Sequence, residues 1–294
     1  MDLLLVFVKG AFRVAQSTIN KKVSNYTVNF DQKLYFGVLF ETAAAIFSFF
    51  YLFLTNFNGF GVPTLFFSFL TGIGFLFELL TSFGALNRAP LGLCVICSLG
   101  GSIVFPAVLG IFLFHESLSL LQWIGVMLFL FAAWLMTPKN SDKSSFVLKS
   151  ALPYLVSNFF INGTLSIISK YYAVYVDNAN PALFSCCSYA IAAVSFLCIF
   201  FFKSRKSKPS VVQEFPKKIY GYSGILGAVC STIVFLSVFL AKTVPIVILN
   251  TVPSAICIVG SSFIGLFIFK EKITKDNIFG TLLSVISIVG VIYY

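Results

Sequence analysis

Long apolar stretches alternate with short polar connections along the whole chain. Backbone N–H and C=O groups find no water partner in hydrocarbon, and no alternation with a period of two suggests a barrel, so each stretch is expected to be a helix. The pattern predicts an all-α membrane protein of ten transmembrane helices. The ten stretches are Leu3–Ile19, Leu34–Leu54, Thr64–Leu86, Leu91–Phe114, Leu120–Met136, Ala151–Ser169, Pro181–Phe202, Ile219–Ala241, Ile246–Phe269 and Ile278–Tyr294.

Composition removes the main alternative class. Of 294 residues, 59% are hydrophobic and only 10% are charged, and the mean hydropathy is +0.97. Soluble domains carry about a quarter charged residues, so a soluble globular protein is excluded. The first stretch gives the weakest signal because Lys9 and Arg13 interrupt it, but it is retained as a span.

An internal repeat divides the chain. A shift of 155 residues places Gly72 on Gly227 and aligns two glutamate-containing turns, 114–119 and 269–274. The same shift also superposes Gly110 on Gly265, Gly125 on Gly280 and Pro90 on Pro245. We therefore expect two five-helix repeats, 1–137 and 151–294, joined by a linker at 138–150. An odd number of spans per half means that the second half is inserted upside down relative to the first.

The distribution of basic residues agrees with this inversion. The connections that follow odd-numbered stretches carry 16 Lys and Arg, and those that follow even-numbered stretches carry 2. The positive-inside rule then places both termini outside the cell. The net charge of +10 is thus explained by membrane orientation. Nucleic-acid binding is not expected, because the basic connection at 203–218 has no interleaved aromatic residues.

Small residues recur every four positions in the fourth stretch and at the matching places in the ninth. Such a strip permits close helix packing, or forms a thin wall beside a cavity in which proline frees a backbone carbonyl for a ligand. Both interpretations stay open. The cavity-lining or packing candidates are Ser98, Ser102, Pro106, Pro253, Cys257 and Ser261.

The two halves resemble the EamA-type proteins of the drug/metabolite transporter superfamily. The resemblance rests on a short glutamate-containing turn before a glycine-containing last helix in each half, at 115–125 and 270–280. It implies ten helices around a central cavity and the transport of amino acids, nucleotide sugars, sugar phosphates or drugs. Two features depart from the family: its frequent Trp-Gly pair is absent from the first helix, and its termini are commonly cytoplasmic.

Four ionisable residues within the stretches are the candidates for coupling or substrate binding. A carboxylate in the bilayer costs several kcal/mol unless it is paired, hydrated or protonated, so Glu78 in mid-stretch is the first candidate for proton coupling. The alternative is a structural carboxyl that faces another helix. Glu41 is second, because it lies near enough to an end to reach headgroups. Lys9 and Arg13 share one helix face and could bind an anion or pair with these carboxylates. Glu116 and Glu271 are expected to cap helices or pair with lysines.

These observations favour a secondary transporter. No phosphate-binding loop exists and the chain has a single histidine, so an ATP-driven pump, a hydrolase or another enzyme is not expected, nor is a cofactor or metal. The predicted partners are a small-molecule substrate, protons and membrane lipids, and the expected location is the plasma membrane. The leading hypothesis is an exporter of a small polar metabolite. The alternatives are an exchanger of anionic substrates, such as nucleotide sugars or sugar phosphates, and a non-transporting lipid-binding or scaffold protein.

Overall fold

The computed structural model of the chain contains ten α-helices and no strand among the residues it describes. These are residues 1–294 apart from 25, 28, 56–60, 87, 89–90, 136–144, 205–215, 268–274 and 293–294. Each predicted stretch is helical, which confirms the all-α class. The helices are α1 (Asp2–Ser24), α2 (Phe30–Tyr51), α3 (Val62–Leu86), α4 (Leu91–Phe114), α5 (Leu120–Leu135), α6 (Ser145–Tyr175), α7 (Pro181–Ser204), α8 (Lys218–Leu240), α9 (Ile246–Phe267) and α10 (Lys275–Ile292).

Seven of the helices are long and apolar enough to cross a membrane over their described residues: α2, α3, α4, α6, α7, α8 and α9. The described apolar parts of α5 and α10 are shorter, and α1 carries the charges that weakened its signal in the sequence. A crossing by α1, α5 and α10 therefore stays a prediction. Many large apolar side chains are exposed, among them Phe50, Phe66 and Phe131, as contact with lipid requires.

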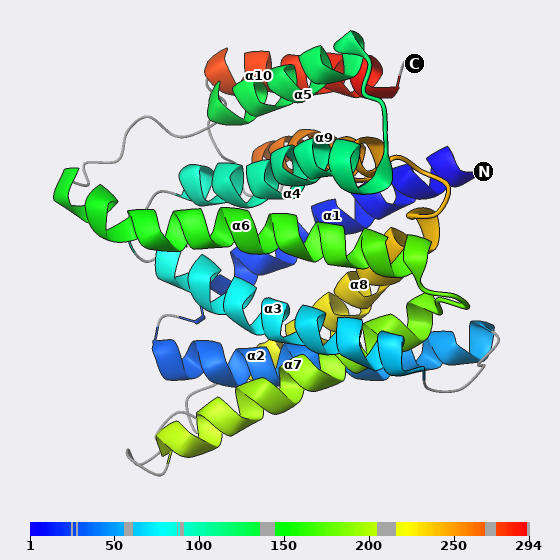
Figure 1. The fold of residues 1–294 in the computed structure, drawn as a ribbon. Coiled ribbons are helices and arrows are strands. Elements are labelled where there is room, and N and C mark those ends of the chain that lie inside the picture. The colour runs from blue at the N-terminus through cyan, green and yellow to red at the C-terminus, as the bar shows by residue number, and fades with distance from the viewer. Residues whose placement is uncertain are drawn as a thin grey trace.

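Helices from the two halves of the chain interleave (Figure 1). α1 packs on α8 and α9, whereas α6 packs on α3 and α4. Likewise α2 packs on α8 and α3 packs on α7, while α2 lies against α7 and α5 against α10. Exchanging each helix with the one five places away along the chain maps the first six contacts onto one another in pairs, and maps the contacts of α2 with α7 and of α5 with α10 onto themselves.

Two glycines of the repeat lie at matching crossings. A Cβ atom on Gly72 of α3 would lie 2.7 Å from the carbonyl oxygen of Ser188 in α7, and one on Gly227 of α8 would lie 2.7 Å from the backbone nitrogen of Ala44 in α2. Only glycine allows backbones to approach this closely without a shift. The shift of 155 residues thus relates two glycines that both lie at a close approach between the halves, although it does not relate the residues that they approach, Ser188 and Ala44.

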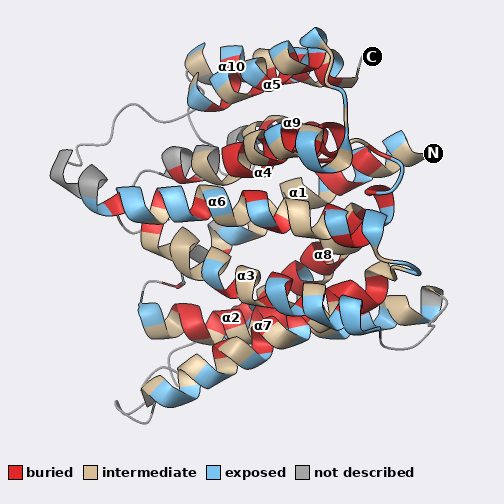
Figure 2. Cartoon of the chain, in the orientation of Figure 1, coloured by how far each residue is buried: buried red, intermediate tan, exposed pale blue. Residues whose placement is uncertain are grey.

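The packed centre of the molecule is built around α8 and α9, which have the largest buried shares among the candidate spans (Figure 2). Its main apolar cluster joins these helices to α1, α4, α5, α6, α7 and α10. Three helices contain an internal proline, namely Pro106 in α4, Pro153 in α6 and Pro253 in α9. Each proline removes one backbone donor from its helix and leaves the carbonyl four residues earlier without that partner.

Candidate functional site

Two carboxylates lie deep in the helix bundle. Glu41 of α2 is 2% exposed, whereas Glu78 of α3 is partly buried. The two are close enough for their charges to act on one another. The Oε2 atom of Glu41 is buried and has no hydrogen-bond partner among the described residues. Because an unpaired carboxylate oxygen is costly in a low-dielectric setting, this atom marks a place for a proton, a cation or a donor group.

Arg13 of α1 is the third charged residue of this region. Its guanidinium acts electrostatically on Glu78, and its buried Nε atom has no hydrogen-bond partner within the described part of the chain. The thiol of Cys257 in α9 donates to the Arg13 carbonyl at 3.4 Å, which fixes the backbone of α1 against α9. The predicted candidates Glu41, Glu78 and Arg13 therefore come together from three helices into one group, here called the central cluster.

An aromatic wall borders the central cluster. The buried ring of Tyr189 in α7 stacks on Phe75 with centroids 4.9 Å apart and meets Phe40 edge-on at 6.5 Å. Tyr189 lies near enough to Glu41 and Glu78 to feel both charges. Two carboxylates beside aromatic faces suit an organic cation or a proton, and the guanidinium beside them suits an anionic group.

Lys9 of α1 takes a different place from the one that its spacing suggested. It is fully buried, and its Nζ atom donates to the backbone carbonyl of Leu249 in α9 at 3.0 Å. Pro253, four residues after Leu249, has no N–H group, so this carbonyl has no donor within its own helix. Pro253 thus frees the Leu249 carbonyl, as the second interpretation of the small-residue strip expects. The group that binds this carbonyl is Lys9 of the same chain. The guanidinium of Arg13, about one turn later on α1, acts electrostatically on Lys9.

The remaining members of the strip are mostly packed. Ser102 is 3% exposed and donates to Leu99 of its own helix at 2.9 Å, while Pro106 is buried and Ser98 partly buried. Beside Ser102, the backbone of Gly101 approaches α6 so closely that a Cβ would lie 2.0 Å from the carbonyl oxygen of Phe159. On α9, Pro253 and Cys257 are buried, and the side chain of Ser261 lies outside what the structure describes.

Asn158 of α6 is a residue that the sequence analysis did not single out. Its amide donates to Ser82 Oγ at 2.6 Å and to Thr81 Oγ1 at 3.3 Å, and it reaches the backbone carbonyl of Glu78 at 3.5 Å. It therefore ties α6 to the turn of α3 that carries Glu78. Two asparagines four residues apart inside one apolar stretch, Asn158 and Asn162, are the signal that could have drawn attention to it.

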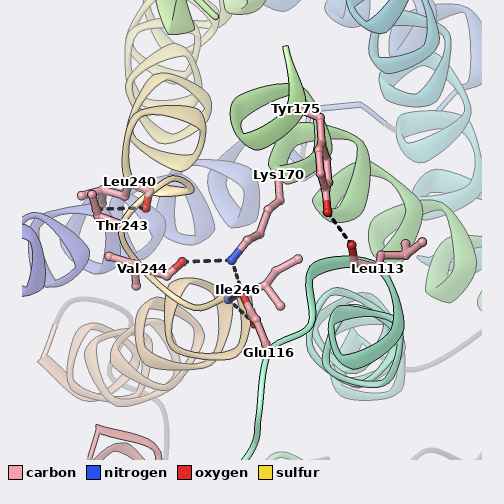
Figure 3. Close-up of polar contacts among 8 residues, drawn as sticks. All are labelled: Leu113, Glu116, Lys170, Tyr175, Leu240, Thr243, Val244 and Ile246. Carbon is pink, nitrogen blue, oxygen red and sulfur yellow. Dashed lines mark hydrogen bonds and ion pairs between the residues drawn. The ribbon is translucent and has the colours of Figure 1, made fainter. Parts of the chain in front are cut away.

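A second group of polar residues lies at one end of the bundle (Figure 3). The Glu116 carboxylate, from the turn between α4 and α5, accepts hydrogen bonds from the backbone N–H of Ile246 at 3.1 and 3.2 Å. Lys170 of α6 forms an ion pair with Glu116 and donates to the carbonyl of Val244 at 3.2 Å. Glu116, Lys170, Val244 and Ile246 are called the clasp below.

The clasp confirms that Glu116 caps a helix and pairs with a lysine, although its lysine lies far away in the sequence. A carboxylate at the start of α9 is favourable because the first backbone N–H groups of a helix lack partners within it. The equivalent Glu271 lies outside the described residues. Lys170 was overlooked because the apolar stretch ends at Ser169, whereas α6 continues to Tyr175.

No group of three or more His, Cys, Asp or Glu side chains that could hold a metal ion occurs where the structure describes the chain.

Comparison with known proteins addresses the predicted resemblance. Residues 149–293 match the EamA-like transporter family. Among solved structures, 28 chains match, and one of them, described only as the crystal structure of a protein, has a TM-score of 0.75 over 99% of this chain and 97% of its own. Its sequence identity of 16% makes this a likeness of fold alone. No curated protein matches the chain. The family match confirms the EamA resemblance over the second half, and with the seven apolar helices it supports an integral, multi-pass membrane protein.

Proposed function

We infer that this chain, whose second half matches the EamA-like transporter family, moves a small polar metabolite across the membrane as a secondary transporter. The observation that carries this proposal is the central cluster. Two carboxylates and a guanidinium inside a bilayer are not expected in a purely structural bundle, because each buried charge costs free energy. In a transporter the same groups bind the cargo and the coupling ion at mid-membrane depth.

Proton coupling is the form of energy input that the central cluster supports best. Glu41 and Glu78 share one low-dielectric site with a single guanidinium, so their combined charge favours one further positive charge, which a proton or a cationic cargo can supply. A proton and a cationic group would then compete for the same carboxylates. Such competition is the basis of exchange, in which cargo leaves as protons enter.

Alternating access is part of the proposal. The contacts of α1 with α8 and α9 have counterparts in those of α6 with α3 and α4, and Gly72 and Gly227 lie at matching crossings. Together with the 16-to-2 distribution of basic residues, this supports two inverted repeats. Two halves of this kind can exchange conformations and so expose one central site to each side of the membrane in turn. We include export across the plasma membrane in the same proposal.

Exchange of anionic substrates is the second candidate function. Arg13 favours it through its buried Nε atom, for which the described residues provide no partner. The contact of Lys9 with Leu249 weighs against it, because the second cation that this function needs is engaged by a backbone carbonyl. A scaffold role would leave the charges of the central cluster without a purpose.

The test is flux in proteoliposomes that contain a pH-sensitive dye and the purified full-length protein. Amino acids, sugars, phosphorylated sugars, nucleosides and cationic drugs are added in turn. The proposal predicts a substrate-dependent proton flux that is lost in Glu78→Gln and in Glu41→Gln. Asp31→Asn is the matched control, since Asp31 is a carboxylate at the start of α2 that pairs with Lys203 near the surface. Silence for every compound, followed by no counterflow of labelled anions, would refute transport.

A further inference from the structure

The first seven residues of α9, 246–252, precede the internal Pro253. Because Pro253 has no N–H group, the hydrogen bond that would join it to the Leu249 carbonyl is missing. Residues 246–252 are thus joined to the rest of α9 by a weakened point, at which helices commonly bend. All seven are buried, at 5% exposure or less.

Side chains from the first half of the chain hold both ends of this segment. At its beginning, the Glu116 carboxylate binds the N–H of Ile246 at 3.1 Å. At its break, the Lys9 ammonium binds the carbonyl of Leu249 at 3.0 Å. An anion thus satisfies the free donor and a cation satisfies the free acceptor, and such charge-assisted hydrogen bonds are about twice as strong as neutral ones.

Lys170 strengthens the first of these contacts. Its ammonium pairs with Glu116, donates to the Val244 carbonyl just before the segment, and lies 5.3 Å from the centre of the Phe114 ring. Glu116 and Lys170, which Figure 3 shows together, come from the turn after α4 and from α6, and Lys9 comes from α1, so that the segment is held by several elements at once.

The segment lies at one end of the helix bundle. It lies at the end of the bundle where α4 meets α5, α6 meets α7 and α8 meets α9, on the same side as the N-terminus (Figure 1). The C-terminal ends of α5 and α7 lie at the opposite end of the bundle. The segment also carries polar groups unsuited to a permanently dry core: Asn250 is 5% exposed, and the buried Thr251 Oγ1 has no partner among the described residues.

We propose that residues 246–252 form the gate at this end of the protein, that Pro253 is its hinge, and that the clasp together with Lys9 holds it closed. Opening breaks the contacts of Glu116 and Lys9 and turns Asn250 and Thr251 toward water. The gate depends on contacts within the chain and not on any cargo, so it can be tested separately from the transport proposal.

The experiment is hydrogen–deuterium exchange of the full-length protein in lipid nanodiscs, followed by mass spectrometry. In Glu116→Gln and in Lys170→Met, we expect the amides of 246–252 to exchange roughly tenfold faster or more, as the loss of hydrogen bonds to charged groups implies. The amides of 254–267 should keep their wild-type rates. Lys9→Met is expected to accelerate the same segment.

Asp31→Asn is the matched control. It removes an ion pair with Lys203 that joins α2 to α7 away from the clasp, so the exchange rates of residues 246–252 should stay at their wild-type values. Pro253→Ala tests the hinge: it restores an N–H for the Leu249 carbonyl, so adding it to Glu116→Gln should slow exchange in 246–252 again. A rise of equal size in every helix, or an unchanged rate in 246–252, would overturn the proposal.

The wild-type protein provides a test that needs no variant. Its residues 246–252 should exchange faster than residues 254–260 on the other side of Pro253, since a hinge lets the first part open alone. A single common rate for both parts would refute the hinge.

Discussion

Replacing Gly227 by alanine places one methyl group where α8 crosses α2. The new Cβ would lie 2.7 Å from the backbone nitrogen of Ala44 and 2.8 Å from the Cβ of Ala43. Neither neighbour is the end of a flexible side chain, so the two helices must move apart. The same replacement at Gly224, one turn earlier on α8, meets no atom within 4 Å and serves as the matched control.

The two variants differ by a free energy that follows from these contacts. Overpacking a tight contact costs about 1–3 kcal/mol, whereas alanine in place of glycine in a helix gains up to about 1 kcal/mol where space allows. Both variants gain the helix propensity of alanine, so this term cancels between them, and Gly227→Ala should be less stable than Gly224→Ala by the overpacking cost of about 1–3 kcal/mol. In thermal unfolding of the purified protein in detergent, this difference corresponds to a midpoint lower by roughly 2–6 °C.

Gly72→Ala extends the test to the internal repeat. Its Cβ would lie 2.7 Å from the carbonyl oxygen of Ser188, so its loss of stability should resemble that of Gly227→Ala. Equal midpoints for Gly227→Ala and Gly224→Ala would refute the close-approach argument. A neutral Gly72→Ala would contradict the same argument where α3 crosses α7.

Substitutions at two further positions test local features. His115 follows the last residue of α4 with a φ of 53°, so His115→Gly should be at least as stable as wild type, whereas the branched side chain in His115→Ile should lower stability by about 1–2 kcal/mol, measured by thermal unfolding. Asn158→Leu should cost about 1–2 kcal/mol because it removes the bonds from α6 to α3, while Asn162→Leu should cost less, since the amide of Asn162 bonds to Asn158 on its own helix. Equal losses for the two asparagine variants in the same assay would contradict the assigned bridge.

The helices could be predicted because hydrophobic length alone defines them in a bilayer. The bounds of α4 agree with its apolar stretch, Leu91–Phe114, residue for residue. α6 is longer than its stretch at both ends and begins at Ser145, within the expected linker. It continues past Ser169 because Lys170, which ended the apolar pattern, is paired with Glu116.

The candidate site was only partly predictable, since partners between helices have no signature in the pattern of one helix. Glu41 was expected near a membrane surface, but α2 begins at Phe30, so Glu41 lies in the middle of its 22 residues and is buried. Lys9 and Arg13 share a helix face as expected. That Lys9 binds Leu249 depends on Pro253 of another helix, and only the packing of α1 on α9 brings the two together.

The central claim is that Glu78 couples cargo movement to protons, and Glu78→Gln can separate coupling from binding. Proteoliposomes with wild type or Glu78→Gln are loaded with a cargo found in the flux assay, and two rates are measured: counterflow of labelled cargo, and accumulation driven by a pH gradient. The account predicts that Glu78→Gln loses gradient-driven accumulation while counterflow persists. Accumulation by Glu78→Gln at the wild-type level would contradict it.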